Sequence, residues 1–562
     1  MTQSIDDQSG TGAPTRRGLM KTGAGMAAVA ASAGSALTSA QAQGFGQAQG
    51  HPIFGGDPSA RRAETVAVRV RAAEHELRRG LPRQMTNGDE SFEDYRASFH
   101  KCLPHNQFGE VDRRAYRKLL RALETGREQQ FAGIPLDRSA DRKLANPQGA
   151  YKFDMTGRDG YNTFMRPAPT FTGLETAAEM GELYWKALCR DVPFSRYGTN
   201  RRIAAAAADL NNFSQTVGPK EGGAVTPGTI FRGETPGDLT GPYISQFLLK
   251  PIPFGNTTIE QRYPAPAPRD DFMTDAYSWL EIQRGAAPTP LFKAGDRYIS
   301  DARALGEYVH TDFSYQAYLS AALILLGMPG SLGDGNPYLD NPTQGGFVSL
   351  GGPDVLDLVA KAGNLSLTGA WYQKWLVHRR ARPEVYGGRL HFQLTGDRDY
   401  DLPDEIADSV AVRRTLRRFD TAFLPMAFPE GSPTHPSYPA GHATIAGACC
   451  TVLKAFFEES ALVQDPVETD ASGQVLYPYA GELTIGGEIN KLANNVSLGR
   501  DWAGVHYRSD GVDGLLVGEQ QAIGMLRDYS LTYNERFDGF KLTTYEGEAI
   551  TIRNGRVIRP AV

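Results

Sequence analysis

Two histidines flank a turn rich in Pro and Gly in the stretch His435-Pro-Ser-Tyr-Pro-Ala-Gly-His442. A helix-compatible run, residues 440–458, begins inside this stretch. Free backbone N–H groups and the helix dipole favour an anion at a helix N-terminus. The stretch therefore predicts an anion site with His442 at its edge, if other segments supply cations and a nucleophile.

A second cluster, Trp371-Tyr-Gln-Lys374-Trp-Leu-Val-His378-Arg-Arg-Ala-Arg382-Pro383, is rich in basic residues. Trp371 and Lys374 are three apart, and Lys374, His378 and Arg382 are four apart, so a helix would place all four near one face. Pro383 is expected to end that helix at about Arg382. From a helix end, an arginine can hold an oxyanion through two hydrogen bonds and a lysine can act as a mobile point charge.

A third cluster runs from Arg500 through His506 to Asp510, with a turn expected at Gly504. Asp510 follows His506 by four residues, so on a helix it can accept the proton of one ring nitrogen. That bond would fix the tautomer and raise the basicity of the other nitrogen. An oriented, unprotonated imidazole beside an arginine suits a nucleophile, or an axial ligand of an oxyanion centre.

Taken in order, the three clusters read Lys…Arg-Pro, Pro-x-Gly-His and Gly-Arg-x5-His-x3-Asp. This order resembles the signature shared by vanadium-dependent haloperoxidases and PAP2-type acid phosphatases. The spacing from Lys374 to Arg382, and the extra His435 seven residues before His442, are similar to the bromoperoxidase type. The large N-terminal region resembles that of bacterial haloperoxidases and exceeds what a minimal phosphatase needs.

The resemblance implies a vanadate cofactor and a role for each residue of the clusters. The residues implied to bind vanadate are Lys374, Arg382, Gly441 (through its N–H), His442, Arg500 and His506. His506 would be the axial metal ligand, oriented by Asp510. His442 would act as general acid and base, and Lys374 would polarise the oxidant. His435 and Trp371 are candidates for the wall on the halide side, or are packing residues.

The implied reaction is the oxidation of a halide, bromide or iodide, by hydrogen peroxide to hypohalous acid, which halogenates a small organic acceptor. One alternative is a PAP2-type phosphatase, in which His506 forms a phosphohistidine and His442 protonates the leaving alcohol. Another is a non-catalytic oxyanion-binding protein. It is suggested by Ala440, which stands where the family usually has a serine whose hydroxyl binds an oxygen of the anion. Related enzymes also suggest a homo-oligomer.

The remaining sequence favours a mainly α-helical, helical-bundle protein with long ordered loops. Expected helices include 302–324, 353–380, 486–496 and 506–530, and one small hairpin is expected around Asn554-Gly555. The resulting domain prediction is a signal peptide at 1–42, an N-terminal helical region at 43–350, a catalytic bundle at 351–535 and a tail at 536–562.

The N-terminus and the composition bear on location and partners. Arg16-Arg17, a mildly apolar run and Ala40-Gln41-Ala42 predict a twin-arginine signal peptide, hence a periplasmic or secreted protein. No run is long and apolar enough to predict a membrane-spanning helix. A net charge of −5 gives no case for nucleic acid as a partner.

The four cysteines lack metal-binding spacing and are expected to be small apolar residues without disulfides.

Overall fold

The computed structural model describes residues 58–560, so the predicted twin-arginine signal lies outside the described residues. Of the described residues, 61–533 and 537–560 form one large unit. The large unit carries every residue of the three predicted clusters.

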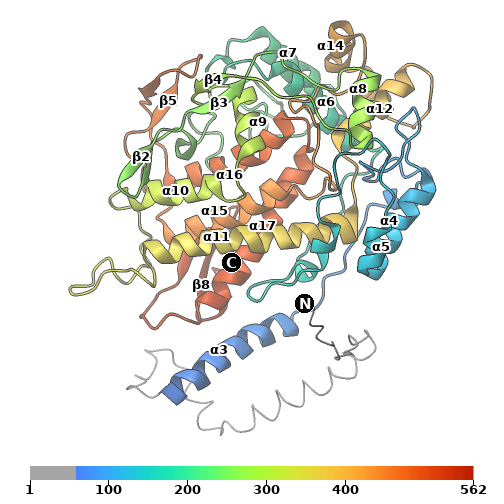
Figure 1. Ribbon diagram of the computed structural model, residues 1–562. Helices are drawn as coiled ribbons and strands as arrows, with labels where there is room; N and C mark the ends of the chain where they lie inside the picture. Colours follow the sequence, from blue (N-terminus) through green and yellow to red (C-terminus); the bar gives the residue numbers. More distant parts are fainter. Residues whose placement is uncertain (1–57, 561–562) are drawn as a thin grey trace, which may run out of the picture. The chain divides into compact units, whose positions relative to one another are not determined.

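The described residues are rich in helix, with long loops between the helices (Figure 1). The longer helices before residue 330 are α3 (Pro58–Arg78), α4 (Arg113–Thr125), α6 (Leu174–Cys189), α7 (Arg201–Leu210), α8 (Ala276–Arg284), α9 (Ala302–Thr311) and α10 (Gln316–Leu326). Those after it are α11 (Gly352–Tyr372), the π-helix η6 (Gln373–His378), α12 (Pro383–Leu394), α14 (Val410–Phe419), α15 (Gly441–Phe456), α16 (Ile485–Trp502) and α17 (Arg508–Tyr529). Two short helices are α5 (Glu128–Ala132) and α13 (Asp404–Ala407).

The described part of the chain also contains small antiparallel sheets. The two-stranded ones pair β1 (Ile252–Phe254) with β2 (Thr257–Ile259), β3 (Tyr263–Pro266) with β4 (Lys293–Arg297), and β5 (Val467–Thr469) with β6 (Leu476–Pro478). The C-terminal sheet has three strands, β7 (Phe540–Thr543), β8 (Ala549–Arg553) and β9 (Arg556–Ile558). The prediction of one hairpin there is therefore incomplete, because Gly547 at φ 85° allows a second turn before the one at Asn554-Gly555.

Helix α15 lies at the centre of the bundle, with α11, α16 and α17 packed around it (Figure 1). All of its residues except His442 are buried. Glycines allow α17 to approach it closely: a Cβ on Gly447 would lie 2.1 Å from the carbonyl oxygen of Leu515, and a Cβ on Gly518 would lie 2.0 Å from that of Thr444. This close packing helps to bring the N-termini of α15 and α17 together.

Several predicted helix bounds are wrong, and local features of the backbone explain the differences. The helix expected over 302–324 is two helices, α9 and α10, because the chain is extended at Asp312. The helix expected over 486–496 continues to Trp502, so that Arg500 belongs to its last turn. Helix α12 is not predicted, because the sequence pattern places Pro383 at the end of a helix. In the structure Pro383 occupies the first turn, where its missing N–H costs nothing.

The largest hydrophobic core extends through the large unit from Ala97 to Ile552, and two smaller clusters include Trp375 and Tyr438. The four cysteines are buried and free, which confirms that they are small apolar residues. Within residues 58–560, no helix combines the length and the hydropathy needed to cross a bilayer. The proposed boundary near residue 350 stays a prediction.

Candidate active site

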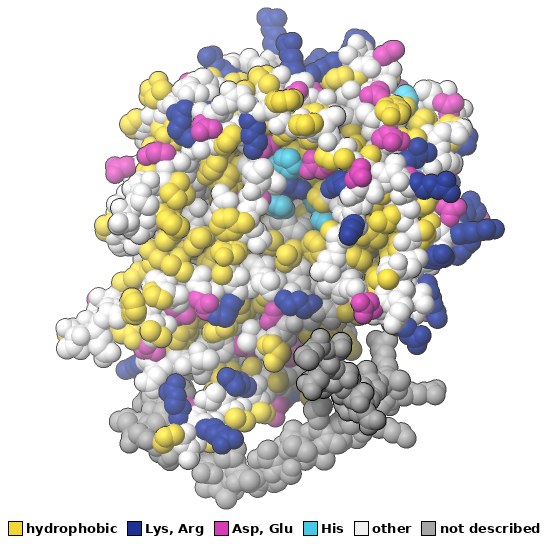
Figure 2. Space-filling model, in the orientation of Figure 1, with side chains coloured by type: hydrophobic (Ala, Val, Ile, Leu, Met, Phe, Trp, Pro, Cys, Tyr) yellow, Lys and Arg dark blue, Asp and Glu magenta, His cyan; other side chains and the backbone are white. Residues whose placement is uncertain are grey.

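The predicted anion site is formed where the N-termini of α15 and α17 meet. The backbone N–H of Ala440, the residue before α15, donates to the carbonyl oxygen of Asp510 in the first turn of α17 at 2.8 Å. The segment from His435 to Ala440 leads into this junction. Figure 2 shows histidine side chains gathered in a hollow near the middle of the drawn face.

Lys374 and Arg382 reach the site from two elements, which corrects the prediction that they share one face of a helix. Lys374 lies in η6, which ends at His378, and Arg379 then turns the chain at φ 50°. Arg382 is the N-cap of α12. The helix must end before Pro383, because proline has no N–H for a helical hydrogen bond and its ring clashes with the preceding turn. His378 is directed elsewhere, and its ring packs against that of Tyr438 with the centroids 4.8 Å apart.

Both cations are buried and hold the segment before α15 through its carbonyl groups. The Lys374 ammonium donates to the carbonyl oxygens of Pro436 at 2.7 Å and Ser437 at 2.8 Å. The Arg382 guanidinium donates through Nε to the carbonyl oxygen of His435 at 2.9 Å. The carbonyl groups orient these side chains but carry no net charge to balance them.

The contacts of His506 fit the tautomer that the sequence predicts. Its Nδ1 lies 2.8 Å from Oδ2 of Asp510, so the carboxylate accepts the Nδ1 proton and Nε2 keeps its lone pair. Nη1 of Arg382 lies 2.9 Å from Nε2 and donates to it. His506 itself precedes α17, and Asp510 is the third residue of that helix. The expected pairing is thus confirmed, although the histidine is not helical.

Asp510 is held by groups that are not among the predicted site residues. Arg380 donates through Nη1 to Oδ1 at 2.8 Å, and Glu179 pairs with the other arm of Arg380 at 3.1 Å. The hydroxyl of Ser437 donates to Oδ2. Ser437 therefore lies on the Nδ1 side of the His506 ring, where it cannot replace the hydroxyl that Ala440 lacks. Arg380 lies in sequence between the predicted site residues Lys374 and Arg382. Its side chain faces Asp510 because η6 ends at His378 and the chain turns at Arg379.

Arg500 completes a group of three buried cations. It donates through Nη1 to the carbonyl oxygen of Val309 at 2.6 Å and lies over the ring of Phe428. Its Nε is buried and has no partner within the described part of the chain. Lys374, Arg382 and Arg500 are thus brought together as predicted.

The electrostatics of the site favour an anion. Burial lowers the pKa of Arg382 to about 9 and that of Arg500 to about 10. Burial, and next the charge of Arg382, lower the pKa of Lys374 well below its ordinary value. Burial and the charges of Arg382, Lys374 and Arg500 lower the pKa of His506 strongly, which keeps its Nε2 unprotonated. An oxyanion among these groups would relieve their repulsion, so the residues present fit vanadate or phosphate.

His442 lies at the open side of the site. Its Nε2 is 3.0 Å from Oδ1 of Asp312, and its side chain is 29% exposed, whereas Asp312 is almost buried. The break between α9 and α10 places Asp312 there, so no helical pattern in the sequence could have revealed it. With Nε2 bound to the carboxylate, Nδ1 is the nitrogen free to exchange a proton.

Trp371 and His435, the candidates for one wall, lie against each other with ring centroids 4.7 Å apart. The indole N–H donates to the carbonyl oxygen of Asn146 at 3.1 Å. Nη2 of Arg382 donates to Nδ1 of His435 at 3.1 Å. His435 therefore touches both an aromatic wall and a cation of the site, and a role in packing alone does not account for the second contact.

His310 joins α9 to the loop that leads to the site. Its Nε2 lies 2.7 Å from Oε1 of Glu430 and its Nδ1 lies 3.2 Å from Oε2 of Glu307, and the ring stacks on Phe428 at 3.9 Å. The hydrogen bonds to the two carboxylates outweigh burial and raise the pKa of His310 to about 9. The imidazolium is therefore a fixed cation at neutral pH.

We expect this cation to make stability depend on pH. Because the pKa is higher in the folded state, the stabilisation is complete below the unfolded pKa of ~6.5 and is lost as pH rises through about 9. Wild type should lose on the order of 3 kcal/mol more unfolding free energy than His310→Gln between pH 6 and 10. Urea unfolding at both pH values measures this, and equal losses in the two proteins would contradict the assignment.

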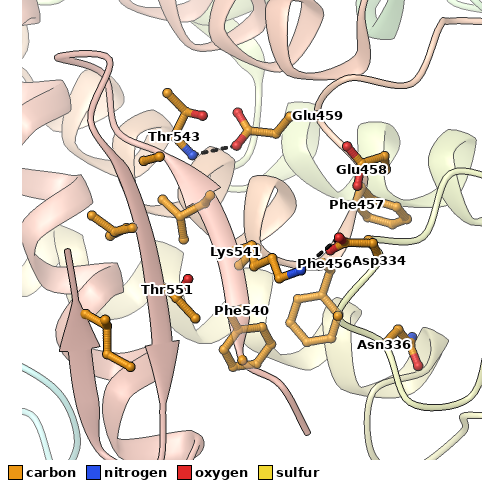
Figure 3. Close-up of a pocket in the computed structure, with 18 of the residues that line it drawn as sticks. Asp334, Asn336, Phe456, Phe457, Glu458, Glu459, Phe540, Lys541, Thr543 and Thr551 are labelled. Atoms are coloured by element: carbon orange, nitrogen blue, oxygen red, sulfur yellow. Dashed lines mark hydrogen bonds and ion pairs between the residues drawn. The ribbon is translucent and has the colours of Figure 1, made fainter. Parts of the chain in front are cut away.

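A different pocket lies beside β7 and does not suit an oxyanion (Figure 3). It has a volume of about 500 Å³ and aromatic walls that include Phe456 and Phe540. Lys541 is neutralised by Asp334 at 2.8 Å, while Glu459 accepts from the backbone N–H of Thr543. Carboxylates at this rim would repel the anion that the buried cations attract.

Comparisons with known proteins agree with this geometry. Residues 407–532 match the model of the second helical-bundle domain of VCPO. The chain is 37% identical to a vanadium-dependent bromoperoxidase of Ascophyllum nodosum over 88% of its length and 93% of the relative. It is 34% identical to one of Corallina pilulifera over 86% of its length and 97% of the relative. A homohexameric vanadate-dependent bromoperoxidase structure from Ascophyllum nodosum has a TM-score of 0.86 at 31% identity, covering 89% of this chain and 92% of the other.

Proposed function

Because the chain belongs to the vanadium-dependent bromoperoxidase family, we propose that it oxidises bromide with hydrogen peroxide to hypobromous acid, with vanadate as cofactor. Peroxide, bromide and one proton give hypobromous acid and water. The observation that carries this proposal is the set of three buried cations around an unprotonated His506 Nε2. The helical bundle is accordingly of the haloperoxidase type, and a small organic acceptor consumes the product.

Vanadate would supply a Lewis acid that activates hydrogen peroxide without a change in the metal's oxidation state. His506 would hold the metal through Nε2. The oxygens would be held by Lys374, Arg382, Arg500, His442 and the N–H of Gly441. The Asp510 carboxylate fixes the His506 ring for that bond, and its own position is fixed by Arg380.

His442 is proposed to transfer the proton in the reaction. Asp312 fixes Nε2 of its ring, so Nδ1 would be the atom that accepts a proton from hydrogen peroxide and returns one during turnover. Lys374, held by two carbonyl groups, would keep its third N–H for the reacting oxygen. Trp371 and His435 would shape the side from which bromide approaches.

The relatives also support proposals about assembly and location. The matched Ascophyllum structure is homohexameric, and we extend a homo-oligomeric state to this chain. Twin-arginine export to the periplasm or the medium stays a proposal that rests on residues 15–42. The phosphatase alternative is less well supported, because the relatives that match most of this chain are bromoperoxidases.

The proposed activity is tested with purified protein, with and without added orthovanadate. Bromide and hydrogen peroxide should brominate an activated phenol only after vanadate is added. Hydrolysis of a phosphomonoester without any bromination would contradict the proposal. Vanadate binding without turnover in either assay would instead support the non-catalytic alternative.

Ala440→Ser tests the effect of the missing hydroxyl. Ala440 is buried at the N-cap position of α15, and its methyl group makes no capping hydrogen bond to the helix. A serine hydroxyl there should strengthen vanadate binding about tenfold or more, since a hydrogen bond to a charged group is worth about 1.5–3 kcal/mol. Equilibrium dialysis measures the dissociation constant. A higher melting temperature with unchanged affinity would show that the hydroxyl only caps the helix.

A further inference from the structure

A cleft rich in arginine lies on the large unit where α7 and α14 are neighbours (Figure 1). It has a volume of about 960 Å³. Its charged lining residues are Arg201, Arg202, Arg269, Arg414, Arg418 and Asp191. They come from three separate segments, namely residues 191–202, the loop at 268–269 and α14. Residues far apart in sequence thus direct five cations to one concave surface.

The carboxylates near the cleft are already occupied by other cations. Asp191 is paired with Arg303 at 2.5 Å, and its second oxygen accepts the backbone N–H of Arg269 at 3.0 Å. Asp271, which accepts from Arg418 at 2.9 Å, is shared with Arg190 at 2.8 Å and with Arg303. Little negative charge is left for the arginines that line the cleft.

Most of the lining guanidinium groups lack a charged partner. Within residues 58–560, Arg201 and Arg269 have no side-chain hydrogen bond or ion pair. Arg202 donates only to the carbonyl oxygen of Leu188 at 2.8 Å. Arg414 lies over the ring of Trp185, at 4.9 Å from its centroid. Such cations repel one another, and a bound anion would remove that repulsion.

The backbone adds to the positive potential. Asn200 and Arg201, at the start of α7, both line the cleft. The Asn200 side chain accepts from the N–H groups of Arg202 and Ile203, and the positive end of the helix dipole lies at the same place. The local charge is thus opposite in sign to the net charge of −5 of the whole chain.

We propose that this arginine cleft binds an anion that carries several phosphate or sulfate groups. Guanidinium forks match the oxygens of these tetrahedral groups in pairs, and several groups are needed to engage arginines from three segments. The cleft shares no residue with the bromide-oxidising site, so the proposal does not depend on that function.

The experiment is calorimetric titration of the full chain, preloaded with vanadate so that the oxyanion site is filled. The probes are tripolyphosphate and sucrose octasulfate, with orthophosphate and citrate for comparison. We expect the two multivalent probes to bind at least about tenfold more tightly than orthophosphate or citrate. Their affinity should fall about tenfold or more between 50 and 200 mM NaCl, because several ion pairs form together. The stronger of the two probes identifies the class, phosphate or sulfate.

The variant Arg201→Gln/Arg269→Gln should lose about tenfold in affinity for the multivalent probe and keep its bromide oxidation. Arg114→Gln/Arg117→Gln on α4 removes the same charge from exposed positions outside the cleft and should bind like wild type. Equal affinity of both variants for the probe would overturn the proposal. So would a lower sedimentation coefficient of the cleft variant without ligand, which would assign the cleft to a subunit contact.

Discussion

His506→Ala should abolish bromide oxidation and vanadate binding together. The imidazole Nε2 of His506 lies beside buried cations, Asp510 holds the proton of the ring on Nδ1, and burial and the neighbouring cations keep Nε2 unprotonated. Alanine leaves the cations in place but removes the atom proposed to bind the metal. The rate should fall by at least about a thousandfold, since loss of a single donor to a reacting oxyanion already costs about 10²–10³.

The measurement combines bromination kinetics with equilibrium dialysis of vanadate. His391→Gln is the matched control, because this half-buried ring packs on Phe423 and takes no part in the site. It should retain activity close to that of wild type. Substantial bromination by His506→Ala would show that another residue binds the metal, and the family assignment would then survive while the ligand assignment would not.

Asp510→Asn should weaken vanadate binding by about 10–100-fold, the usual cost of losing a partner that orients a metal ligand. The carboxylate accepts from His506, Arg380 and Ser437, all of them buried. An amide can present its NH2 to Nδ1 of the ring. That contact would favour the tautomer with the proton on Nε2, the atom needed for the metal.

Ser437→Ala is the matched control for this variant. It removes one hydrogen bond to the same carboxylate but leaves its charge and its pairs with His506 and Arg380. Its vanadate affinity should fall only a few-fold, at roughly 1 kcal/mol for one hydrogen bond. If Asp510→Asn bound vanadate as well as Ser437→Ala, orientation of His506 by Asp510 would not matter for the cofactor. Circular dichroism of both variants checks that they fold like wild type.

Much of the candidate site could be predicted from local spacing. The interval of four residues between His506 and Asp510 predicts their contact, because Asp510 in the first turn of α17 can reach back to a side chain just before the helix. The Pro/Gly-rich turn before residues 440–458 likewise predicts the start of α15 and its free N–H groups. The resemblance to haloperoxidases rested on these motifs, and the bromoperoxidase relatives confirm it.

Contacts that depend on breaks in regular structure could not be predicted in this way. Proline is compatible with both the end of one helix and the first turn of the next, so the sequence alone allowed one helix through Lys374 and Arg382. In the structure the π-helix ends at His378 and α12 starts at Pro383, which turns Arg380 toward Asp510.

The chain by itself determined which residue types carry the chemistry, because motif spacing is a local property. Tertiary structure alone decided their partners. Asp312 meets His442 across a gap of 130 residues, and Arg380 meets Asp510 across the same gap. The glycines of α15 and α17 mark a close approach, yet only the packed helices show which backbone each one meets. Such contacts depend on how whole elements pack, and no periodicity within one segment encodes that.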